Sequence, residues 1–275
     1  MHRLLVKTEL LNEASPTLPR DAAKHLKVLR PKDGEEIELF DGKGKWRVYR
    51  FCASLRSGQE SASPLVATSQ TFQTSQTSQT FQALTLFACV TKGSRWDWTI
   101  EKATELGVGR IVPVISDRTI VRIPMAERAA KRERWLRIAE DAARQSDAKW
   151  LPEILEAVDF ADALPLVRET ACFIGALTNP PSRPLALAVR DEVEKRGGGG
   201  QRTDRVPLSV FIGPEGDFTP DELKTLMDIA TPTSFGPTIL RAETAAIFAV
   251  SVLASMRGCL RGREKQIADN TILCA

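Results

Sequence analysis

The chain has 275 residues, of which 43% are hydrophobic, and this length accommodates about two domains with cores of their own. Its 38 Lys and Arg residues against 35 Asp and Glu residues leave a formal charge of only +3, which excludes a general basic field as the means of binding a nucleic acid. The five scattered cysteines without a C-x-x-C pair, the charged N-terminus and the lack of an apolar stretch long enough to span a bilayer predict a cytoplasmic protein.

Residues 1–55 predict a small β-barrel domain. Residues 34–40 and 45–52 alternate between apolar and polar side chains, as half-buried strands do, and the Asp-Gly-Lys-Gly sequence at residues 41–44 is typical of a hairpin turn. Residues 56–82 are rich in Ser, Thr and Gln and poor in aliphatic side chains. We expect a linker or an extended loop there, because such a segment cannot bury a core.

The residues from 83 to 262 predict an α/β domain. Apolar runs typical of buried strands alternate with helical patterns, which favours a parallel sheet. The expected strands are residues 83–90, 110–115, 171–177, 208–213 and 233–235. The tail at residues 263–275 shows no periodicity and is expected to be loosely held.

One predicted helix, residues 125–145, carries the strongest cluster of cations in the chain. Its members are Arg128, Lys131, Arg132, Arg134, Arg137 and Arg144. Acidic residues stand among them at helical spacing. The cluster is therefore either a surface for RNA or a solvated helix face with many ion pairs.

A glycine-bearing loop, Ile-Gly-Pro-Glu-Gly-Asp-Phe at residues 212–218, joins an apolar run to a helix start. Thr219 and Glu222 have the spacing of a capping box, and Pro220 suits the first position of the helix. Free amides at a helix start normally favour a phosphate, but Glu215 and its acidic neighbours surround this loop with negative charge. We expect either a hydroxyl-rich, cationic ligand such as S-adenosylmethionine or a simple Gly-Pro turn with a solvated acidic rim.

A second corner of the same kind follows at residues 234–246, which read Ser-Phe-Gly-Pro-Thr-Ile-Leu-Arg-Ala-Glu-Thr-Ala-Ala. The helix predicted from residue 242 to residue 256 is apolar nearly all round, so we expect it to be buried in the core or against a second subunit. Arg241 precedes it, where the helix dipole disfavours a cation by about 0.3–1 kcal/mol. It either pairs with Glu243 or another carboxylate, or is aimed at a nucleic-acid phosphate or a base carbonyl.

Together the two corners resemble the paired signature of the RsmE family, the methyltransferases of the SPOUT superfamily that make 3-methyluridine in small-subunit ribosomal RNA. Residues 92–108 (Lys-Gly-Ser-Arg-Trp-Asp-Trp-Thr-Ile-Glu-Lys-Ala-Thr-Glu-Leu-Gly-Val) and residues 140–154 are similar to two further family motifs in the same order. The resemblance covers residues 83–258 and implies a parallel sheet whose C-terminal part forms a deep trefoil knot. It also implies a PUA-like β-barrel at the N-terminus and a homodimer.

The resemblance implies the binding residues as well. The pocket for S-adenosylmethionine is expected to consist of Ala176, Leu177, Thr178, Ile212, Gly213, Pro214, Glu215, Gly216, Phe235, Gly236, Ile239, Leu240 and Thr244. Contacts to ribosomal RNA are expected from Arg3, His25, Lys27, Arg30, Lys43, Lys45, Arg47, Lys92, Arg144 and Lys149. Ordinary solvated charges are the alternative for each of these cations.

The chemistry of the implied reaction indicates two catalytic residues. As the imide proton of uracil leaves, negative charge spreads to the flanking carbonyl oxygens, and we predict that Arg241 stabilises it. Glu243 is predicted to orient Arg241 or to serve as the base, and the alternative is that it only complements the helix N-terminus. No metal is expected, because the chain contains only His2 and His25 and nothing with the spacing of a zinc site.

The sequence departs from the family pattern at three places. Asp217 stands where a glycine is usual, Thr238 where an arginine is frequent, and Asp147-Ala148 where a Gly-Arg pair is usual. We expect donor binding to survive and RNA affinity or target choice to change, with Lys149 partly restoring the lost charge. Three hypotheses remain: an active methyltransferase, an inactive RNA-binding or ribosome-assembly protein on the same scaffold, and a nucleotide-binding enzyme that uses residues 212–218 for phosphate.

Overall fold

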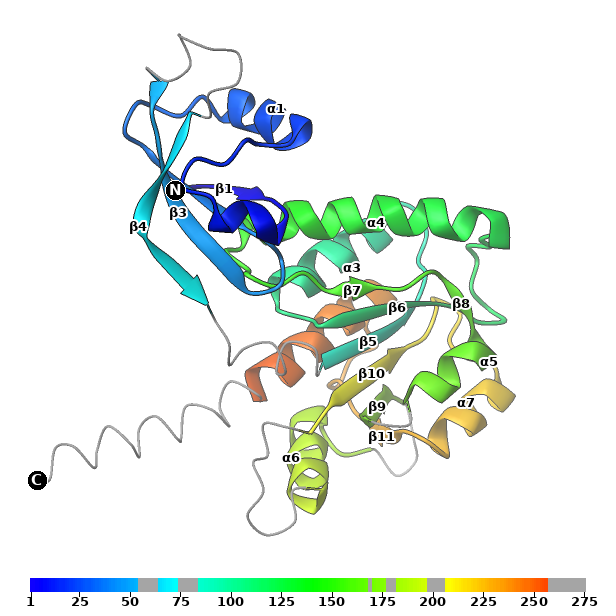
Figure 1. The fold of residues 1–275 in the computed structure, drawn as a ribbon. Helices are drawn as coiled ribbons and strands as arrows, with labels where there is room; N and C mark the ends of the chain where they lie inside the picture. The colour runs from blue at the N-terminus through cyan, green and yellow to red at the C-terminus, as the bar shows by residue number, and fades with distance from the viewer. Residues whose placement is uncertain (54–63, 74–83, 168–169, 177–181, 197–205, 257–275) are drawn as a thin grey trace, which may run out of the picture. The chain divides into compact units, whose positions relative to one another are not determined.

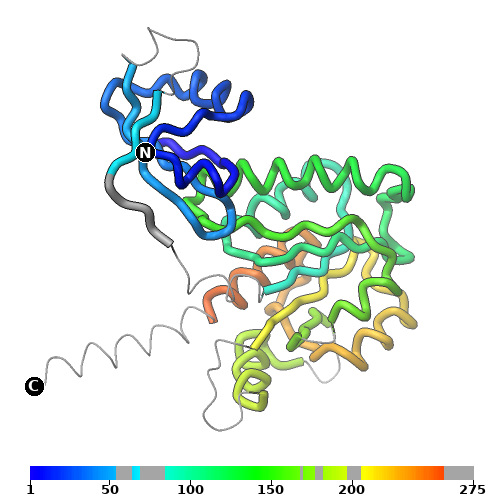
Figure 2. Tube along the Cα trace, in the orientation of Figure 1, coloured from blue at the N-terminus to red at the C-terminus, as the bar shows by residue number. Residues whose placement is uncertain are grey.

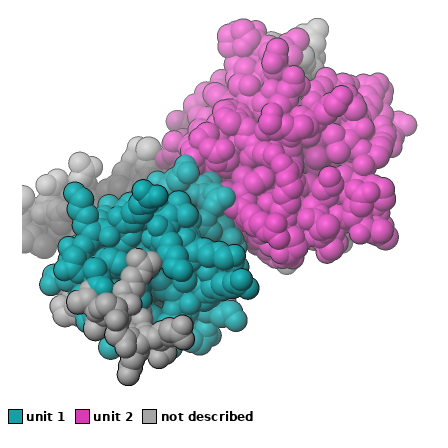
Figure 3. Space-filling model, turned by 90° about the horizontal axis from the view of Figure 1, so that it is seen from above, with its two compact units in different colours: residues 1–78, 140–151 teal, residues 79–139, 152–275 magenta. Residues whose placement is uncertain are grey.

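The computed structural model of the chain describes residues 1–53, 64–73, 84–167, 170–176, 182–196 and 206–256. The chain divides into two compact units, coloured separately in Figure 3. Unit 1 comprises residues 1–78 and 140–151, and unit 2 comprises residues 79–139 and 152–275. Unit 1 thus reaches beyond the predicted boundary at residue 55 and includes a later segment of the chain. Within the described ranges, no helix is both long enough and apolar enough to cross a membrane.

Unit 1 is built on a four-stranded sheet with the strand order β1-β2-β3-β4. The strands are β1 (His2–Leu5), β2 (Glu36–Phe40), β3 (Lys45–Phe51) and β4 (Leu65–Gln73). β1 runs parallel to β2, whereas β2, β3 and β4 pair antiparallel. The two predicted strands and the turn between them are therefore confirmed, apart from their ends.

Two helical segments complete unit 1, namely η1 (Thr8–Asn12) and α1 (Arg20–Leu29). Sequence reasoning missed α1. Its inner stripe of Ala22, Leu26 and Leu29 packs against the core formed by the strands, and charged residues separate these three positions in the sequence. A stripe of only three apolar positions gives little of the periodicity by which a helix is predicted from sequence.

Strand β4 corrects the prediction of a linker. Leu65–Gln73 lies inside the stretch expected to be a linker, yet it pairs with β3, and Leu65 is fully buried. An edge strand needs few aliphatic residues, and Val and Thr favour it. The low aliphatic content was therefore misleading at these residues, while residues 56–63 and 74–82 lie outside the described part of the chain.

Unit 2 contains a seven-stranded sheet in which every pairing is parallel, as predicted. The strand order is β11-β9-β10-β5-β6-β7, and β8 also pairs with β6. The strands are β5 (Leu84–Cys89), β6 (Arg110–Ile115), β7 (Glu153–Ile154), β8 (Val158–Asp159), β9 (Ala171–Gly175), β10 (Leu208–Ile212) and β11 (Thr231–Thr233). β10 therefore lies between β9 and β5 in the middle of the sheet.

Helices cover both faces of this sheet (Figure 1 and Figure 2). One face is packed by α3 (Ser94–Glu105), α4 (Met125–Gln145), α6 (Leu185–Arg196) and the helix at residues 242–256. The other face is packed by α5 (Phe160–Ala163), η3 (Leu164–Val167) and α7 (Pro220–Met227). Successive strand residues point to opposite faces, so Leu86 belongs to the first core and Phe87 to the second.

The predicted helix at residues 242–256 is present but is not buried all round within this chain. Ala246, Ala249, Val250 and Leu253 are buried against the sheet, whereas Phe248 is 38% exposed. One side of the helix therefore packs into the core and another faces outward. The sequence pattern alone does not separate these two sides, because both are apolar.

Candidate functional site

The first glycine corner is held in place by the start of α7. The Thr219 amide donates to Glu222 Oε2 at 2.9 Å, and the Glu222 amide donates to Thr219 Oγ1 at 3.3 Å, which confirms the predicted capping box. The other oxygen of the same carboxylate, Glu222 Oε1, accepts from the Asp117 amide at 2.9 Å. Glu222 therefore fixes the helix start to the segment that follows β6.

The loop between β10 and α7 is anchored at its end and braced from the side. Phe218 is buried and meets the ring of Phe211 edge-on, with 5.9 Å between ring centroids. Arg118 Nη1 donates to the carbonyl oxygens of Gly216 at 3.0 Å and Phe218 at 3.2 Å. A Cβ atom on Gly213 would lie 3.0 Å from Phe218 Cε2, so this position is close to requiring glycine.

The second corner follows β11. A Cβ atom on Gly175, at the end of β9, would lie 2.6 Å from Phe235 Cε2, so this glycine makes room for the ring. The Phe235 ring also contacts Phe248, with 5.7 Å between centroids. Gly236 has a φ of +124°, a backbone conformation that favours glycine, and its amide donates to Ser234 Oγ at 3.2 Å.

A cavity of about 370 Å³ lies between the two corners. Of the residues predicted to bind the donor, those that line it are Ala176, Ile212, Gly213, Pro214, Glu215, Phe235, Gly236, Ile239 and Leu240. Gly216 and Thr244 do not line it, and Leu177 and Thr178 lie outside the described residues. The lining that sequence reasoning missed is Gly175, Phe211, Asp217, Thr233, Ser234, Thr238, Ala242 and Ala245. Most of these residues are sequence neighbours of predicted ones, so extending the prediction to the ends of the adjacent strands would have found them.

The charged groups in the cavity lining and next to it differ from the predicted arrangement, since Glu243 and Arg95 do not line the cavity. Arg241 lines the cavity, and its side chain has no ion pair or hydrogen bond within the described part of the chain. Glu243 does not orient it, because Glu243 Oε1 faces Arg95 Nε of α3 at 3.7 Å. Arg95 Nη1 also lies 3.7 Å from Glu215 Oε1. Arg95 was missed as a site residue, although it lies inside the motif at residues 92–108.

Residues 78–254 match the family model described as RNA methyltransferase domain, and residues 18–51 match the model described as RNA methyltransferase PUA domain. The chain belongs to this RNA methyltransferase family. The resemblance predicted from the two corners is therefore confirmed.

Curated relatives and solved structures agree. The ribosomal RNA small subunit methyltransferase E of Bacillus subtilis (strain 168) is 30% identical over 63% of this chain and 66% of its own length. The protein of the same name from Synechocystis is 28% identical over 93% of this chain and 78% of its own length. The crystal structure of that methyltransferase from Neisseria gonorrhoeae, bound to S-adenosyl methionine, has a TM-score of 0.70 and 26% identity, covering 93% of this chain and 98% of the other.

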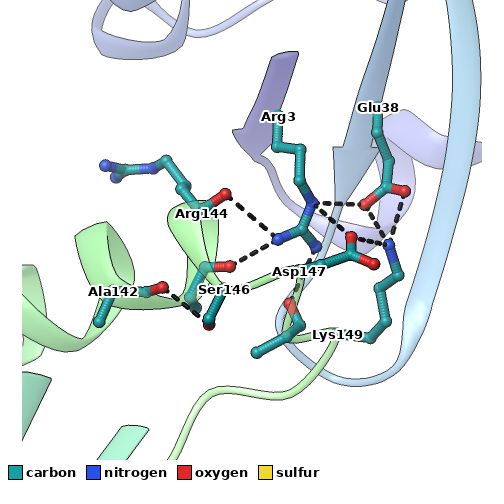
Figure 4. Close-up of polar contacts among 9 residues, drawn as sticks. Arg3, Glu38, Ala142, Arg144, Ser146, Asp147 and Lys149 are labelled. Atoms are coloured by element: carbon teal, nitrogen blue, oxygen red, sulfur yellow. Dashed lines mark hydrogen bonds and ion pairs between the residues drawn. The ribbon is translucent and has the colours of Figure 1, made fainter. Parts of the chain in front are cut away.

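In unit 1 of this methyltransferase, two of the predicted RNA contacts pair with groups of the protein itself (Figure 4). Arg3 is 8% exposed, and its Nε lies 2.8 Å from Glu38 Oε1. Its Nη2 donates to the carbonyl oxygen of Ala148 at 2.9 Å. Lys149 Nζ lies 2.6 Å from both oxygens of Glu38 and 2.8 Å from Asp147 Oδ1. Protein groups already satisfy both cations, which counts against the prediction that Arg3 and Lys149 bind RNA.

The remaining predicted RNA contacts fall into two groups. Arg47 donates to the Leu11 carbonyl at 3.0 Å, and Arg144 pairs with Glu140 at 3.5 Å and with Asp141. The other candidates have accessible side chains: His25, Lys27, Arg30, Lys43 and Lys92 are exposed, and Lys45 is half-buried.

The basic cluster of α4 is partly neutralised within the protein. Arg128 pairs with Asp159 at 2.7 Å, and Arg134 pairs with Asp97. Arg132 Nε donates to the Ile154 carbonyl at 2.7 Å. At these positions the helix matches the ion-paired alternative better than a free surface for RNA.

The departures at Asp147 and Asp217 share one backbone feature. Both residues have a φ of +60°, the left-handed conformation in which glycine is the default and Asp is one of the tolerated exceptions. Asp217 Oδ1 accepts from the Phe218 amide at 2.8 Å, and Asp147 pairs with Lys149 and Arg3. Each Asp therefore replaces the conformational freedom of glycine with a local polar contact.

Proposed function

We propose that this chain transfers a methyl group from S-adenosylmethionine to the imide nitrogen of a uridine in small-subunit ribosomal RNA. The observation that carries the proposal is the cavity between two glycine corners at the carboxyl ends of β10 and β11, where ligands of parallel α/β sheets bind. The names of the curated relatives and the donor bound in the Neisseria structure support the same substrate pair.

The cavity suits this donor in size and charge. Its volume of about 370 Å³ lies in the usual range for small-molecule pockets, roughly 300–1,000 Å³. Glu215 and Asp217 in its lining favour a cation over a polyphosphate, which argues against the nucleotide-binding alternative. The residues that would hold the donor are Ile212, Gly213, Pro214 and Glu215 from the first corner and Phe235, Gly236, Ile239 and Leu240 from the second. When bound, the donor supplies a methyl group activated by a sulfonium.

The protein itself supplies positioning and electrostatic stabilisation. Arg241 reaches the cavity, and its side chain has no partner among the residues that the structure describes, which leaves its guanidinium available for the uracil carbonyl on which negative charge develops. The exposed side chains of His25, Lys27, Arg30, Lys43 and Lys92, with half-buried Lys45, are our candidates for phosphate contacts. The reaction is placed in the cytoplasm, in keeping with the scattered cysteines.

The fold is proposed to include the trefoil knot and the homodimer of the SPOUT superfamily. β11 follows β10 in the chain but lies beyond β9 in the sheet, and the helix at residues 242–256 then joins the same core cluster as residues of β5. Ile239 lines the cavity and is 85% exposed within this chain, so a second copy packed over it would close the cavity. Sedimentation of the purified protein as a dimer supports this arrangement, whereas a monomer that binds donor fully contradicts it.

Two experiments test the proposal. Calorimetry should show binding of S-adenosylmethionine and none of ATP, because the acidic corner repels phosphate. Nucleoside analysis of ribosomal RNA from a strain that lacks the gene should show loss of 3-methyluridine. Unchanged 3-methyluridine would contradict the enzymatic function and favour the inactive RNA-binding scaffold.

A further inference from the structure

The contacts of Arg95 single it out at the start of α3. Its guanidinium faces two carboxylates from different elements, Glu215 after β10 and Glu243 in the helix at residues 242–256, each at 3.7 Å. β5 and β10 pair in register up to Ala88 and Ile212, so the segments that follow these strands emerge side by side. Arg95 therefore links the acidic corner of the cavity to the C-terminal helix.

One carboxylate oxygen of Glu243 faces Arg95, and the other is buried without a hydrogen-bond partner among the described residues. Its side chain is 12% exposed, and Oε1 faces Arg95. Its Oε2 is buried and accepts no hydrogen bond among the described residues. A buried acceptor that lacks a donor is destabilising and rare in folded proteins, so its presence calls for a functional reason.

The segment that carries Arg95 contains further atoms of this kind, including Trp96 Nε1 and Asp97 Oδ1 in α3. Thr91 lies two residues after β5 and is 3% exposed, and its Oγ1 is also without a partner among the described residues. Buried polar groups normally find partners within the fold. Glu243 does not itself line the cavity, but Arg95 joins it to Glu215, which does, so the unpartnered oxygen of Glu243 belongs to the surroundings of the cavity.

We propose that Arg95 is a positioning residue that holds Glu243 through Oε1, so that Oε2 accepts the imide proton of the target uracil. This inference rests on the proposed function. The imide nitrogen gives up its proton to Glu243 Oε2 and forms a bond to the methyl carbon, while the bond from that carbon to sulfur breaks and its electron pair stays on sulfur. The proton then passes from Glu243 to water.

The pH dependence of single-turnover methylation tests the role of Glu243. With a carboxylate base, the rate of the wild type should change little with pH near neutrality, because the carboxylate rather than hydroxide removes the imide proton. Glu243→Gln should lower the rate at pH 7 by about 10²–10⁴-fold and make it rise about tenfold per pH unit, since the uracil must then ionise unaided. A Glu243→Gln profile parallel to that of the wild type overturns the assignment.

The role of Arg95 is tested through coupling to Glu243. Arg95→Ala should lower the rate by about tenfold or more and steepen the pH profile, with partial recovery in Arg95→Lys. In a Glu243→Gln background, Arg95→Ala should have almost no further effect, because both changes remove the same function. The inference is overturned if the rate losses of the two single variants multiply in the double variant. It is also overturned if Arg95→Ala has the rate and the pH profile of the wild type.

Controls separate this inference from the proposed function. Arg110→Ala removes a similarly exposed Arg from an ion pair with Glu153 and should leave the rate unchanged. Affinity for an RNA fragment in the presence of S-adenosylhomocysteine should be unchanged in Arg95→Ala, and a large loss would mean that Arg95 is an RNA contact instead. A wild-type protein that methylates no RNA contradicts the proposed function. An active wild type whose rate is unchanged by Arg95→Ala contradicts only the inference.

Discussion

Two clusters of Arg and carboxylate groups in this protein show how the same residue types serve different ends. In unit 1, Arg3 and Lys149 contact Glu38 at 2.8 and 2.6 Å. In unit 2, Arg95 lies 3.7 Å from each of its two carboxylates, and one oxygen of Glu243 has no partner among the described residues. In the first cluster Arg3, Lys149 and Glu38 are all paired with one another or with neighbouring groups. In the second cluster one carboxylate oxygen remains available to accept a proton.

The largest effect in this comparison is expected at Glu38. Glu38 is 1% exposed, so Glu38→Ala leaves two cations without their shared partner and should destabilise unit 1 by about 3–5 kcal/mol. Denaturant unfolding measures the loss, and Glu153→Ala, which breaks the exposed pair with Arg110, should cost at most about 1 kcal/mol. Equal losses in the two variants would show that the network of unit 1 is not a special source of stability.

The next largest effect separates two glycines of the first corner. Gly213→Val should weaken donor binding about 100-fold or more, because even a Cβ atom meets Phe218 at 3.0 Å and the added methyl groups crowd the cavity. Gly216→Ala places its Cβ atom 3.6 Å from Arg118 Cβ, an ordinary contact, and should change affinity less than about threefold. Calorimetry with S-adenosylmethionine compares the two, and equal affinities would place the donor elsewhere.

A smaller contrast is expected between Asp147 and Asp217. Replacement by glycine relieves left-handed strain of roughly 1 kcal/mol at either site. Asp217→Gly loses one hydrogen bond and should be neutral within about 0.5 kcal/mol. Asp147→Gly also loses contacts to Lys149 and Arg3 and should be net destabilising. Chemical denaturation measures both, and a stabilised Asp147→Gly variant would show that those contacts contribute nothing.

The smallest expected effect is the loss, at low pH, of the stability that Asp147 contributes. Burial acts to raise the pKa of Asp147, but the hydrogen bond and charge of Lys149, together with the charge of Arg3, lower this pKa on balance below its ordinary value. A lowered folded-state pKa contributes stability above the unfolded-state pKa, near 3.9, and that stability is lost as the pH falls through the folded-state value. The difference in unfolding free energy between the wild type and Asp147→Asn should therefore shrink below about pH 4. A difference that grows in acid would reverse the assigned sign.

Local patterns predicted the parts of the molecule that depend on neighbours in sequence. The capping box of Thr219 and Glu222, the parallel strands and the two corners all follow from short spacings. The burial of Arg3 and the pairing of Arg95 with Glu243 do not, because each joins residues more than 100 positions apart. Strand β4 was missed for a related reason, since pairing with β3 rather than its own composition stabilises it.

The position of bound S-adenosylmethionine tests the central claim most directly. A crystal structure of the protein with this donor should show it between residues 212–217 and residues 235–241. Its sulfonium should lie near the acidic rim formed by Glu215 and Asp217. Density for the donor at any other place, or no binding at donor concentrations that saturate a related methyltransferase, would contradict the account.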